Sequence, residues 1–193
     1  MTETILTTSR LIIRNWREED RDLFHEINSD PDVMEFFPRR RNRQESDELF
    51  DYLRKLIAGT GLGFYALEHT ETGDTLGFCG IMRTSHEPAI PDGTVEIGWR
   101  LAKRHWGAGY ISEAATALLQ HGFDNHGLKE IVAFTVPQNR RSRAVMERIG
   151  MTHHEDRDFD HPKVPATTPQ FIRHVLYAIS APSAADPIPS APQ

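Results

Sequence analysis

The sequence predicts an α+β domain, in which about four helices flank a twisted sheet that is mostly antiparallel and contains one parallel strand pair. Two strand-like runs joined by a short turn are typical of an antiparallel hairpin, and a later strand–helix–strand succession is typical of a parallel pair. A last strand-like run closes the pattern. With 193 residues, of which 38% are hydrophobic, the chain fits one domain around a single core. We expect that domain to span residues 1–180.

The first third of the chain predicts a strand and two helices. Residues 9–16 (SRLIIRNW) alternate in the manner of a strand that opens the fold. Residues 17–28 carry acidic residues in a first helical turn and then apolar residues at helical spacing, and the DPDV stretch that follows ends this helix. A second helix is expected to begin after Gln44 or Ser46, where an apolar stripe starts, and to end at the glycines of residues 58–63.

The middle of the chain predicts three antiparallel strands. Residues 63–70 and 75–84 are strand-like runs on either side of the turn ETGD, which is a hairpin pattern. We expect a proline-containing loop over residues 85–93 (SHEPAIPDG) and a third strand over residues 94–102 (TVEIGWRLA).

A helix and a buried strand come next. Apolar residues at helical spacing run from Ile111 to Phe123, and the helix is expected to end near Gly127. Residues 130–136 (EIVAFTV) are apolar enough for a buried strand. Because strand, helix and strand follow one another, the two strands should pair in parallel through a right-handed crossover.

The C-terminal part predicts one more helix and the closing strand. Asn139 can cap a helix that runs through Ile149, and Gly150 can supply its left-handed stop. Residues 170–180 (QFIRHVLYAIS) form the last expected strand. Residues 181–193 are rich in proline and alanine, and we expect them to be a disordered tail.

The composition argues against several classes of protein. A net charge of −6, with no aromatic-interleaved basic stripe to offset it, makes nucleic acid an unexpected partner. No apolar run is long enough for a membrane span, and the first residues do not resemble a secretory signal. The single cysteine, Cys79, suits a reducing compartment, so we expect a cytoplasmic protein without a membrane partner. The four arginines of residues 39–43 favour a solvated loop over an anion clamp.

A glycine turn stands at the start of the helix after residues 94–102. In RHWGAGYISEA, residues 104–114, Gly107 and Gly109 immediately precede the helical pattern. A helix N-terminus has unpaired N–H groups and about half a positive charge, and glycines allow an anion to approach it closely. A tight strand-to-helix turn is the alternative interpretation. A dinucleotide fold would need a third glycine and an acid at the end of the next strand, and a phosphate loop would need GK[ST]; all are absent.

Together these motifs resemble the GNAT N-acetyltransferase superfamily. Arg104, Gly107 and Gly109, between VEIGWRLA and YISEAATALL, look like its acyl-CoA pyrophosphate loop. The stretch NRRSRAVMERIGM is similar to its next helix, and LTTSRLIIRNW and FIRHVLYAI resemble its RimJ/RimL-like branch, which acetylates protein N-terminal amines. The resemblance covers about residues 7–180 and implies a GNAT-like fold with acetyl-CoA as cosubstrate.

The resemblance also implies where acetyl-CoA binds. The strands of residues 94–102 and 130–136 would splay apart, and the backbone groups freed there would pair with the pantetheine arm rather than cost about 1–3 kcal/mol each when buried. Backbone N–H groups from about His105 to Ile111 would hold the pyrophosphate. The arginines of NRRSR would reach the 3′-phosphate or form a solvated helix face. The expected cofactor-binding residues are Leu101, Arg104, His105, Trp106, Gly107, Ala108, Gly109, Tyr110, Ile111, Asn139 and Arg141.

Three residues are candidates for the chemistry. By resemblance, Glu96 removes the amine proton, directly or through water, and a half-buried carboxylate beside Val95 and Ile97 would have a raised pKa suited to that role. Alternatively, Glu96 faces solvent or attracts the amine electrostatically. Asn139 would lie near the pantetheine arm and Ser142 near the sulfur as proton donor, with ordinary helix capping as the alternative.

No metal site is expected from the sequence. Residues 156–160 (DRDFD) imitate the start of a calcium loop, but His161 replaces the required glycine and Thr167 replaces the closing glutamate. The ten histidines show no spacing typical of zinc ligands.

The expected activity is acetyl transfer to a primary amine by direct attack in a ternary complex. At pH 7, deprotonation costs about 1.4 kcal/mol for an α-amine but about 4.6 kcal/mol for a lysine, so a protein or peptide N-terminus is the favoured acceptor. A small amine such as an antibiotic or polyamine, a non-catalytic acyl-CoA sensor and a homodimer stay open. Acceptor recognition is expected from residues 29–44 and 158–170, in which a turn-capping role is favoured for His161.

Overall fold

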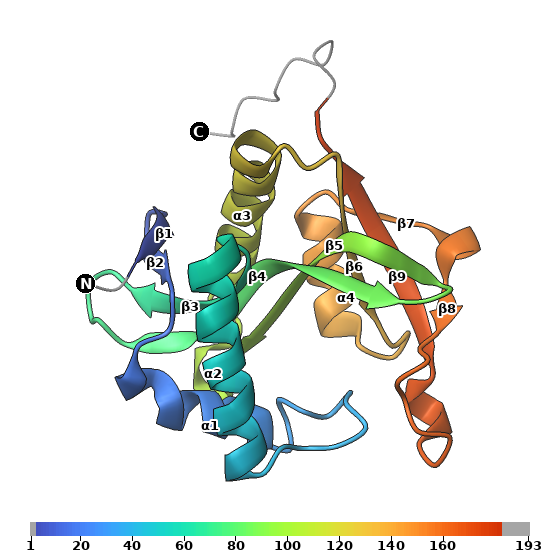
Figure 1. The fold of residues 1–193 in the computed structure, drawn as a ribbon, viewed down its shortest axis with the longest axis horizontal. Helices are drawn as coiled ribbons and strands as arrows, with labels where there is room; N and C mark the ends of the chain where they lie inside the picture. The colour runs from blue at the N-terminus through green and yellow to red at the C-terminus, as the bar shows by residue number, and fades with distance from the viewer. Residues whose placement is uncertain (1–2, 183–193) are drawn as a thin grey trace.

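The structure, a computed structural model, describes residues 3–182, which contain four α-helices and a nine-stranded sheet (Figure 1). The helices are α1 (Arg21–Ser29), α2 (Arg43–Thr60), α3 (Tyr110–His126) and α4 (Arg140–Arg148). The strands are β1 (Thr4–Thr7), β2 (Leu11–Arg14), β3 (Gly63–His69), β4 (Thr75–His86), β5 (Ile90–Leu101), β6 (Glu130–Thr135), β7 (Thr152–His153), β8 (Phe159–Asp160) and β9 (Arg173–Ser180). The predicted fold class is confirmed.

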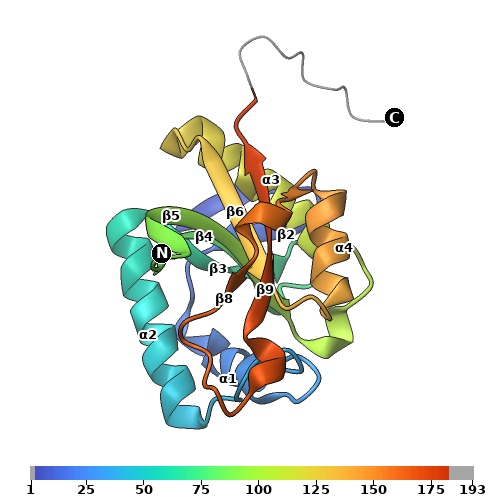
Figure 2. The ribbon, with the colours of Figure 1, turned by 90° about the vertical axis from the view of Figure 1, so that its right-hand side faces the viewer.

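The order of the strands separates the chain into two halves of one sheet. Neighbours follow the order β1-β2-β3-β4-β5-β6-β9-β7, and β8 pairs with β9. Only β5 and β6 pair in parallel; every other described pair is antiparallel. In Figure 2, α2 and α4 lie on opposite sides of the central strands. The crossover helix α3 packs on β4 and β5.

Aromatic residues form the part of the core beneath α1 and α2. Trp16, Phe24, Phe50 and Phe78 are buried, and the ring centroids of Trp16 and Phe24 are 4.9 Å apart in an edge-to-face contact. Such pairs stabilise a core beyond their burial alone. This cluster fixes α1 against β4 and so sets the position of the chain segment between α1 and α2.

The parallel pair is short, and this shapes the site. The only paired position between β5 and β6 is Glu96 with Val132. Beyond Glu96, β5 continues to Leu101 while pairing with β4, and β6 continues to Thr135 while pairing with β9. The facing edges of β5 and β6 therefore diverge from Glu96 onward, as the resemblance implied.

Several boundaries differ from the predictions. Helix α2 begins at Arg43, because Asn42 and Glu45 form a reciprocal capping box ahead of the apolar stripe. The loop predicted over residues 85–93 is shorter than expected: β4 and β5 extend into it, His86 pairs with Ile90, and residues 87–89 form the turn between them. Ile90 is buried, which draws this proline-containing segment into the sheet.

The ends of the domain add elements that the sequence patterns did not predict. Strand β1 pairs with β2, and the two-residue strands β7 and β8 pair with β9. The N–H of Ala181 donates to the carbonyl of Lys129, so the chain is held just past β9. The rest of the predicted tail, residues 183–193, lies outside the described residues. Over residues 3–182, no helix has the length and apolar character needed to cross a bilayer.

Candidate active site

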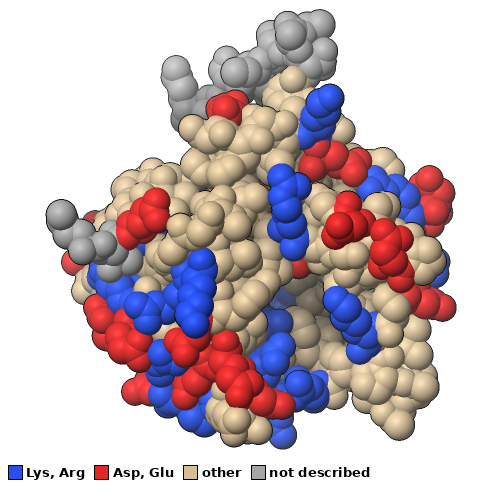
Figure 3. All heavy atoms as spheres, in the orientation of Figure 1, with Lys and Arg blue, Asp and Glu red and all other residues tan. Residues whose placement is uncertain are grey.

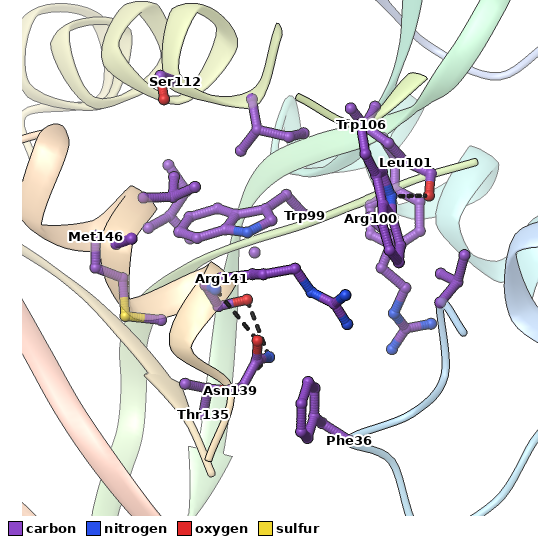
Figure 4. Close-up of a pocket in the computed structure, with 18 of the residues that line it drawn as sticks. Phe36, Trp99, Arg100, Leu101, Trp106, Ser112, Thr135, Asn139, Arg141 and Met146 are labelled. Atoms are coloured by element: carbon purple, nitrogen blue, oxygen red, sulfur yellow. Dashed lines mark hydrogen bonds between the residues drawn. The ribbon is translucent and has the colours of Figure 1, made fainter. Parts of the chain in front are cut away.

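A pocket of about 840 Å³ lies where β5 and β6 diverge. The space-filling view shows a hollow in one face of the molecule, with Lys and Arg atoms inside it and on its rim (Figure 3). Its wall combines the C-terminal part of β5, the end of β6, the first turns of α3 and α4, and residues of the segment between α1 and α2 (Figure 4). The pocket therefore joins the glycine turn to Glu96 in one continuous space.

The glycine turn presents free backbone donors to this pocket. Gly107 and Gly109 have φ values of 78° and 81°, which favour glycine, and Gly109 is the N-cap of α3. Over residues 3–182, no acceptor pairs with the N–H groups of residues 107–112. The left-handed turns thus aim unpaired N–H groups and the positive end of α3 at the same place, which suits a phosphate.

Arg10 and Glu113 brace this turn from outside the pocket. The guanidinium of Arg10 donates to Glu113 Oε2 at 2.7 Å and to the carbonyl of Ala108 at 3.0 Å. Burial alone would raise the pKa of Glu113, but hydrogen bonds from Thr8 and Arg10 lower it to about 2. A charged Glu113 in the first turn of α3 also complements the helix dipole. The β1–β2 turn is thereby tied to the glycine turn.

Nine of the eleven residues expected to bind the cofactor line the pocket, and two do not. Arg104 forms an ion pair with Glu26 of α1, and Ala108 uses its carbonyl to accept from Arg10. The nine lining residues are Leu101, His105, Trp106, Gly107, Gly109, Tyr110, Ile111, Asn139 and Arg141.

Arg141 and Trp106 connect the two sides of the pocket. The Arg141 guanidinium lies 4.5 Å from the centroid of the Trp106 ring and pairs with Glu35 at 2.6 Å. Trp106 Nε1 donates to the carbonyl of Leu101 at 3.0 Å. The first turn of α4 is therefore in contact with both the glycine turn and the α1–α2 segment. The neighbouring Arg143 instead donates to Tyr177 and Pro137 and has a structural role.

Asn139 and Ser142 form the cap of α4. The side-chain carbonyl of Asn139 accepts from the Ser142 N–H at 3.2 Å, and its amide donates to Ser142 Oγ and to Thr135 Oγ1, both at 3.0 Å. The capping interpretation is thus confirmed for Asn139. Ser142 Oγ accepts in this arrangement, so its own proton is left to donate, and the side chain lines the pocket.

Glu96 lies at the branch point of the two strands, in the pocket wall. Burial raises the pKa of its carboxyl group to about 7, an effect that the positive charge of Lys163 reduces. The carboxylate has no hydrogen-bond partner in the part of the chain that the structure describes. It therefore exchanges a proton near neutral pH and is free to contact a ligand.

Two histidines stand in the pocket wall with Glu96. The ring centroids of His86 and His161 are 4.3 Å apart, and His161 Nδ1 accepts from the Lys163 N–H at 3.2 Å, as expected of a turn cap. Burial, followed by the charges of its histidine neighbours, lowers the pKa of His161 to about 4. His161 is consequently neutral at physiological pH.

Part of the aromatic and cationic side of the pocket was not predicted from the sequence. Arg100 follows Glu96 and Gly98 at alternate positions of β5, so all three project to one face of the sheet. That alternation was the available signal. Phe64 and Phe78 of this wall were also not predicted, whereas Val33, Phe36 and Phe37 belong to residues 29–44, the segment expected to recognise the acceptor.

Other candidate groups stay outside the site. In residues 39–43, Arg39 pairs with Glu45, and Arg43 pairs with Asp22 and Asp47 on the surface. Among the described residues, no three His, Cys, Asp or Glu side chains are grouped so that they could hold a metal ion. Cys79 is buried in the core.

Comparisons with known proteins agree with this geometry. Residues 10–152 match the family model described as Acetyltransferase (GNAT) domain. The uncharacterized protein YkkB of Bacillus subtilis is 34% identical over 77% of this chain and 86% of its own length, and the uncharacterized N-acetyltransferase YnaD of the same organism is 32% identical over 76% and 81%. The crystal structure of an acetyltransferase from Agrobacterium tumefaciens aligns with a TM-score of 0.73 at 28% identity, covering 94% of this chain and 95% of that one.

The family model spans most of the chain, including the glycine turn, Glu96 and the cap of α4. The chain therefore belongs to the GNAT acetyltransferase family and is an acetyl-CoA-dependent acyltransferase.

Proposed function

We propose that the chain transfers the acetyl group of acetyl-CoA to the N-terminal amine of a protein or peptide, by direct attack in a ternary complex, as a member of the RimJ/RimL-like branch. One observation carries this proposal: a single pocket contains unpaired backbone donors at the start of α3, a carboxyl group with a pKa near 7 and an available hydroxyl.

The residues present fit acetyl-CoA. The free N–H groups of residues 107–112 would hold the diphosphate, and no Cβ or side chain at Gly107 stands in the way. The open edge of β5 beyond Glu96 would pair with the amide groups of the pantetheine arm. Arg141 would meet the phosphates at the first turn of α4, after exchanging its partner Glu35. The cosubstrate supplies the activated acyl group.

The protein's own groups then manage the protons. The amine nitrogen attacks the thioester carbon, so a C–N bond forms and the C–S bond breaks. Glu96 accepts the proton that the amine loses, directly or through water; its pKa of about 7 is close to the α-amine value of about 8. Ser142 donates a hydrogen bond to the departing sulfur, with its oxygen held by Asn139.

The charge of the pocket favours an N-terminal amine over a polyamine. Arg100 and Arg141 line the wall, and Glu96 is its only carboxylate in the described chain, so the pocket lacks the acidic lining that a polycation needs. The fold alone does not decide the acceptor. RimL, the ribosomal L7/L12 α-N-protein acetyltransferase, aligns with a TM-score of 0.74 at 16% identity, and spermidine N-acetyltransferase of Vibrio cholerae with 0.69 at 15%.

Two measurements test the proposal. Acetyl-CoA at about 100 times its Kd should add about 2.7 kcal/mol to the free energy of unfolding and raise the melting temperature by a few degrees. A panel of N-terminal peptides, lysine side-chain analogues and small amines, scored by release of free CoA, should then show turnover mainly with peptides. Turnover confined to small amines would reassign the acceptor, and binding without any turnover would favour a sensor.

A further inference from the structure

Arg100 is a cation in the pocket wall, and none of the described carboxylates pairs with it. Its Nη1 donates to Asn28 Oδ1 at 2.7 Å, and its guanidinium lies 4.0 Å from the Phe37 ring centroid and 5.5 Å from that of Phe78. In residues 3–182, no acidic group forms an ion pair with it. One neutral amide oxygen thus serves a group with five N–H donors.

The charged neighbour that affects Arg100 is a second cation, Arg41, and not a carboxylate. Burial, followed by the neighbouring positive charge of Arg41, lowers the pKa of Arg100 to about 9. The N–H of Arg41 donates to the carbonyl of Asn28, so Asn28 holds both arginine residues at one place. Arg100 is partly buried, and a cation that has lost part of its hydration is costly unless an anion compensates the loss. An anionic group of a ligand would do so.

The position of Arg100 points to the acceptor rather than to the coenzyme. Arg100 projects from the same face of β5 as Glu96, and its contacts are with α1, β4 and the segment between α1 and α2. The free N–H groups that suit a diphosphate belong instead to residues 107–112. In Figure 4 the Arg100 guanidinium points into the open part of the pocket, on the side of Phe36.

The spacing of Arg100 from Glu96 sets the size of the acceptor. Four residues along a strand span about 13 Å, whereas an extended peptide advances about 3.3 Å per residue. An amine at Glu96 and an anion at Arg100 are therefore separated by a few peptide units, more than the length of a single amino acid. Phe37, Phe64 and Phe78 provide an apolar wall beside that path.

We propose that Arg100 is a specificity residue that selects acceptor peptides with an acidic side chain at one of positions two to four, through a forked pair with the carboxylate. This inference rests on the proposed N-terminal acetyltransferase function. Arginine suits the role because its planar guanidinium donates two parallel hydrogen bonds to a carboxylate.

The test compares peptides that differ only in charge. Each acceptor peptide carries glutamate at position two, three or four, and its partner carries glutamine at the same position. With the wild-type protein and saturating acetyl-CoA, kcat/KM for at least one glutamate peptide should exceed that of its glutamine partner by about tenfold or more, as expected of a charge-assisted pair.

Variants of Arg100 test whether this residue causes the preference for glutamate peptides. Arg100→Gln should bring the glutamate-to-glutamine ratio to within about twofold of one, whereas Arg100→Lys should keep part of it, because the charge stays and the fork is lost. Arg83→Gln, on the exposed part of β4 outside the pocket, is the matched control and should leave the ratio unchanged. A purely structural role for Arg100 would lower both rates equally and leave the ratio as it is.

Several results would overturn the inference. Equal turnover of glutamate and glutamine peptides by the wild-type protein would overturn this inference and leave the proposed function standing. A preference for glutamate that survives in Arg100→Gln would do the same. A rise in the KM for acetyl-CoA, equal with both peptides, would assign Arg100 to the coenzyme. If acetyl-CoA binds but no peptide is acetylated, the proposed function itself fails, and this inference fails with it.

Discussion

Glu96 shows how one residue takes its chemistry from neighbours far away in sequence. The alternation of β5 predicts that Glu96 is half-buried, and that alone favours a raised pKa. His86, Phe134 and His161, which complete the pocket wall beside it, come from three other segments. Because these neighbours are neutral or apolar, they withdraw water from the carboxylate without stabilising its charge.

The pH dependence of catalysis follows from that environment. The base works in its ionised form and the amine attacks in its neutral form, so kcat/KM should level off only above pH 8. It should fall about tenfold per pH unit between pH 8 and the Glu96 pKa of about 7, and about 100-fold per unit below it. Glu96→Gln should lower kcat/KM by about 10²–10⁴-fold and remove the limb near pH 7, leaving that of the acceptor amine near pH 8. An unchanged limb near pH 7 in Glu96→Gln would show that another group is the base.

Ser142 can be tested without disturbing its helix. The cap of α4 uses the backbone N–H of Ser142 and the side chain of Asn139, so Ser142→Ala removes the hydroxyl and keeps the cap. We expect kcat to fall about 10–100-fold while the Kd for acetyl-CoA changes by less than about threefold. Isothermal titration and steady-state rates measure the two quantities. Asn139→Ala is the contrast, since losing the cap should cost about 1 kcal/mol of stability. Normal turnover by Ser142→Ala would end the proposed role.

Functional residues that belong to a local motif can be predicted from the sequence. Residues whose role depends on the lack of a charged partner in the folded chain cannot. Gly107, Gly109 and Asn139 are recognisable because a helix start requires a glycine turn or a cap. Arg100 is different. Its proposed role depends on the lack of a carboxylate beside it within residues 3–182, and this lack becomes visible only when β4, β5 and α1 are assembled.

Helices and strands with a clear hydrophobic period can be predicted from the sequence, whereas short strands that form only because a neighbouring strand pairs with them cannot. The apolar stripe from Ile111 gives α3 correctly, and the glycine at 127 is its left-handed end. Strands β1, β7 and β8 are two to four residues long, and each has a partner that is distant or already paired on its other side. Such short segments carry too few residues for alternation to be read.

In the glycine turn, the effect of backbone conformation can be tested separately from the effect of steric clash. A Cβ at Gly107 would meet no atom within 4 Å, but φ is 78° there, so Gly107→Ala carries only the backbone cost of about 1–2 kcal/mol. If the turn relaxes to avoid this cost, its N–H groups rotate away from the diphosphate. We expect the Kd for acetyl-CoA to rise about 5–30-fold, measured by titration.

Gly59 offers the matched control for that substitution. It lies in α2 and does not line the pocket, and a Cβ there also meets no atom within 4 Å. Its backbone is helical, so Gly59→Ala should stabilise the protein by about 0.5–1 kcal/mol and leave the Kd for acetyl-CoA unchanged. If the two variants bound acetyl-CoA equally well, the left-handed turn would not be needed for the coenzyme.

At the scale of the whole molecule, the site exists because β9 is inserted next to β6. The strand order gives β6 a complete antiparallel partner in β9 and only one paired position with β5. The two diverging strands thus stay hydrogen-bonded along their other edges, β5 to β4 and β6 to β9, so the opening between them costs little free energy. The sequence predicts a parallel pair by its strand–helix–strand order, but where the pair stops depends on strand twist and on β9, which follows it in the chain.

A buried ionic cluster joins four elements in the other half of the sheet. Arg14 of β2 donates to Asp20 ahead of α1 at 2.7 Å, to Glu68 of β3 at 2.7 Å and to Thr75 of β4 at 2.9 Å. The Arg14 side chain is 2% exposed and that of Asp20 is 3% exposed. Burial alone would raise the pKa of Asp20, but hydrogen bonds from Arg14 and its other partners hold it below its usual value.

Arg14→Met should therefore destabilise the whole domain. It leaves the buried carboxylate of Asp20 without its cation, while Glu68 keeps its ion pair with Arg17 at 2.7 Å; breaking a buried pair costs about 3–5 kcal/mol. Arg157→Met is the control: Arg157 forms two hydrogen bonds with Glu130, but both side chains are about one third or more exposed, at 34% and 42%, so its loss should cost less than about 1 kcal/mol. Urea unfolding at pH 7 measures the loss of stability in both variants.

Because the pKa of Asp20 is lowered in the folded state, the stabilising effect of its ionised carboxylate is present at neutral pH. This effect declines as the pH falls through the usual pKa range of an aspartate toward the lower pKa of the folded state. The gap between wild type and Arg14→Met should narrow accordingly in acid. An equal, small loss for both variants would mean that the cluster does not hold these four elements together.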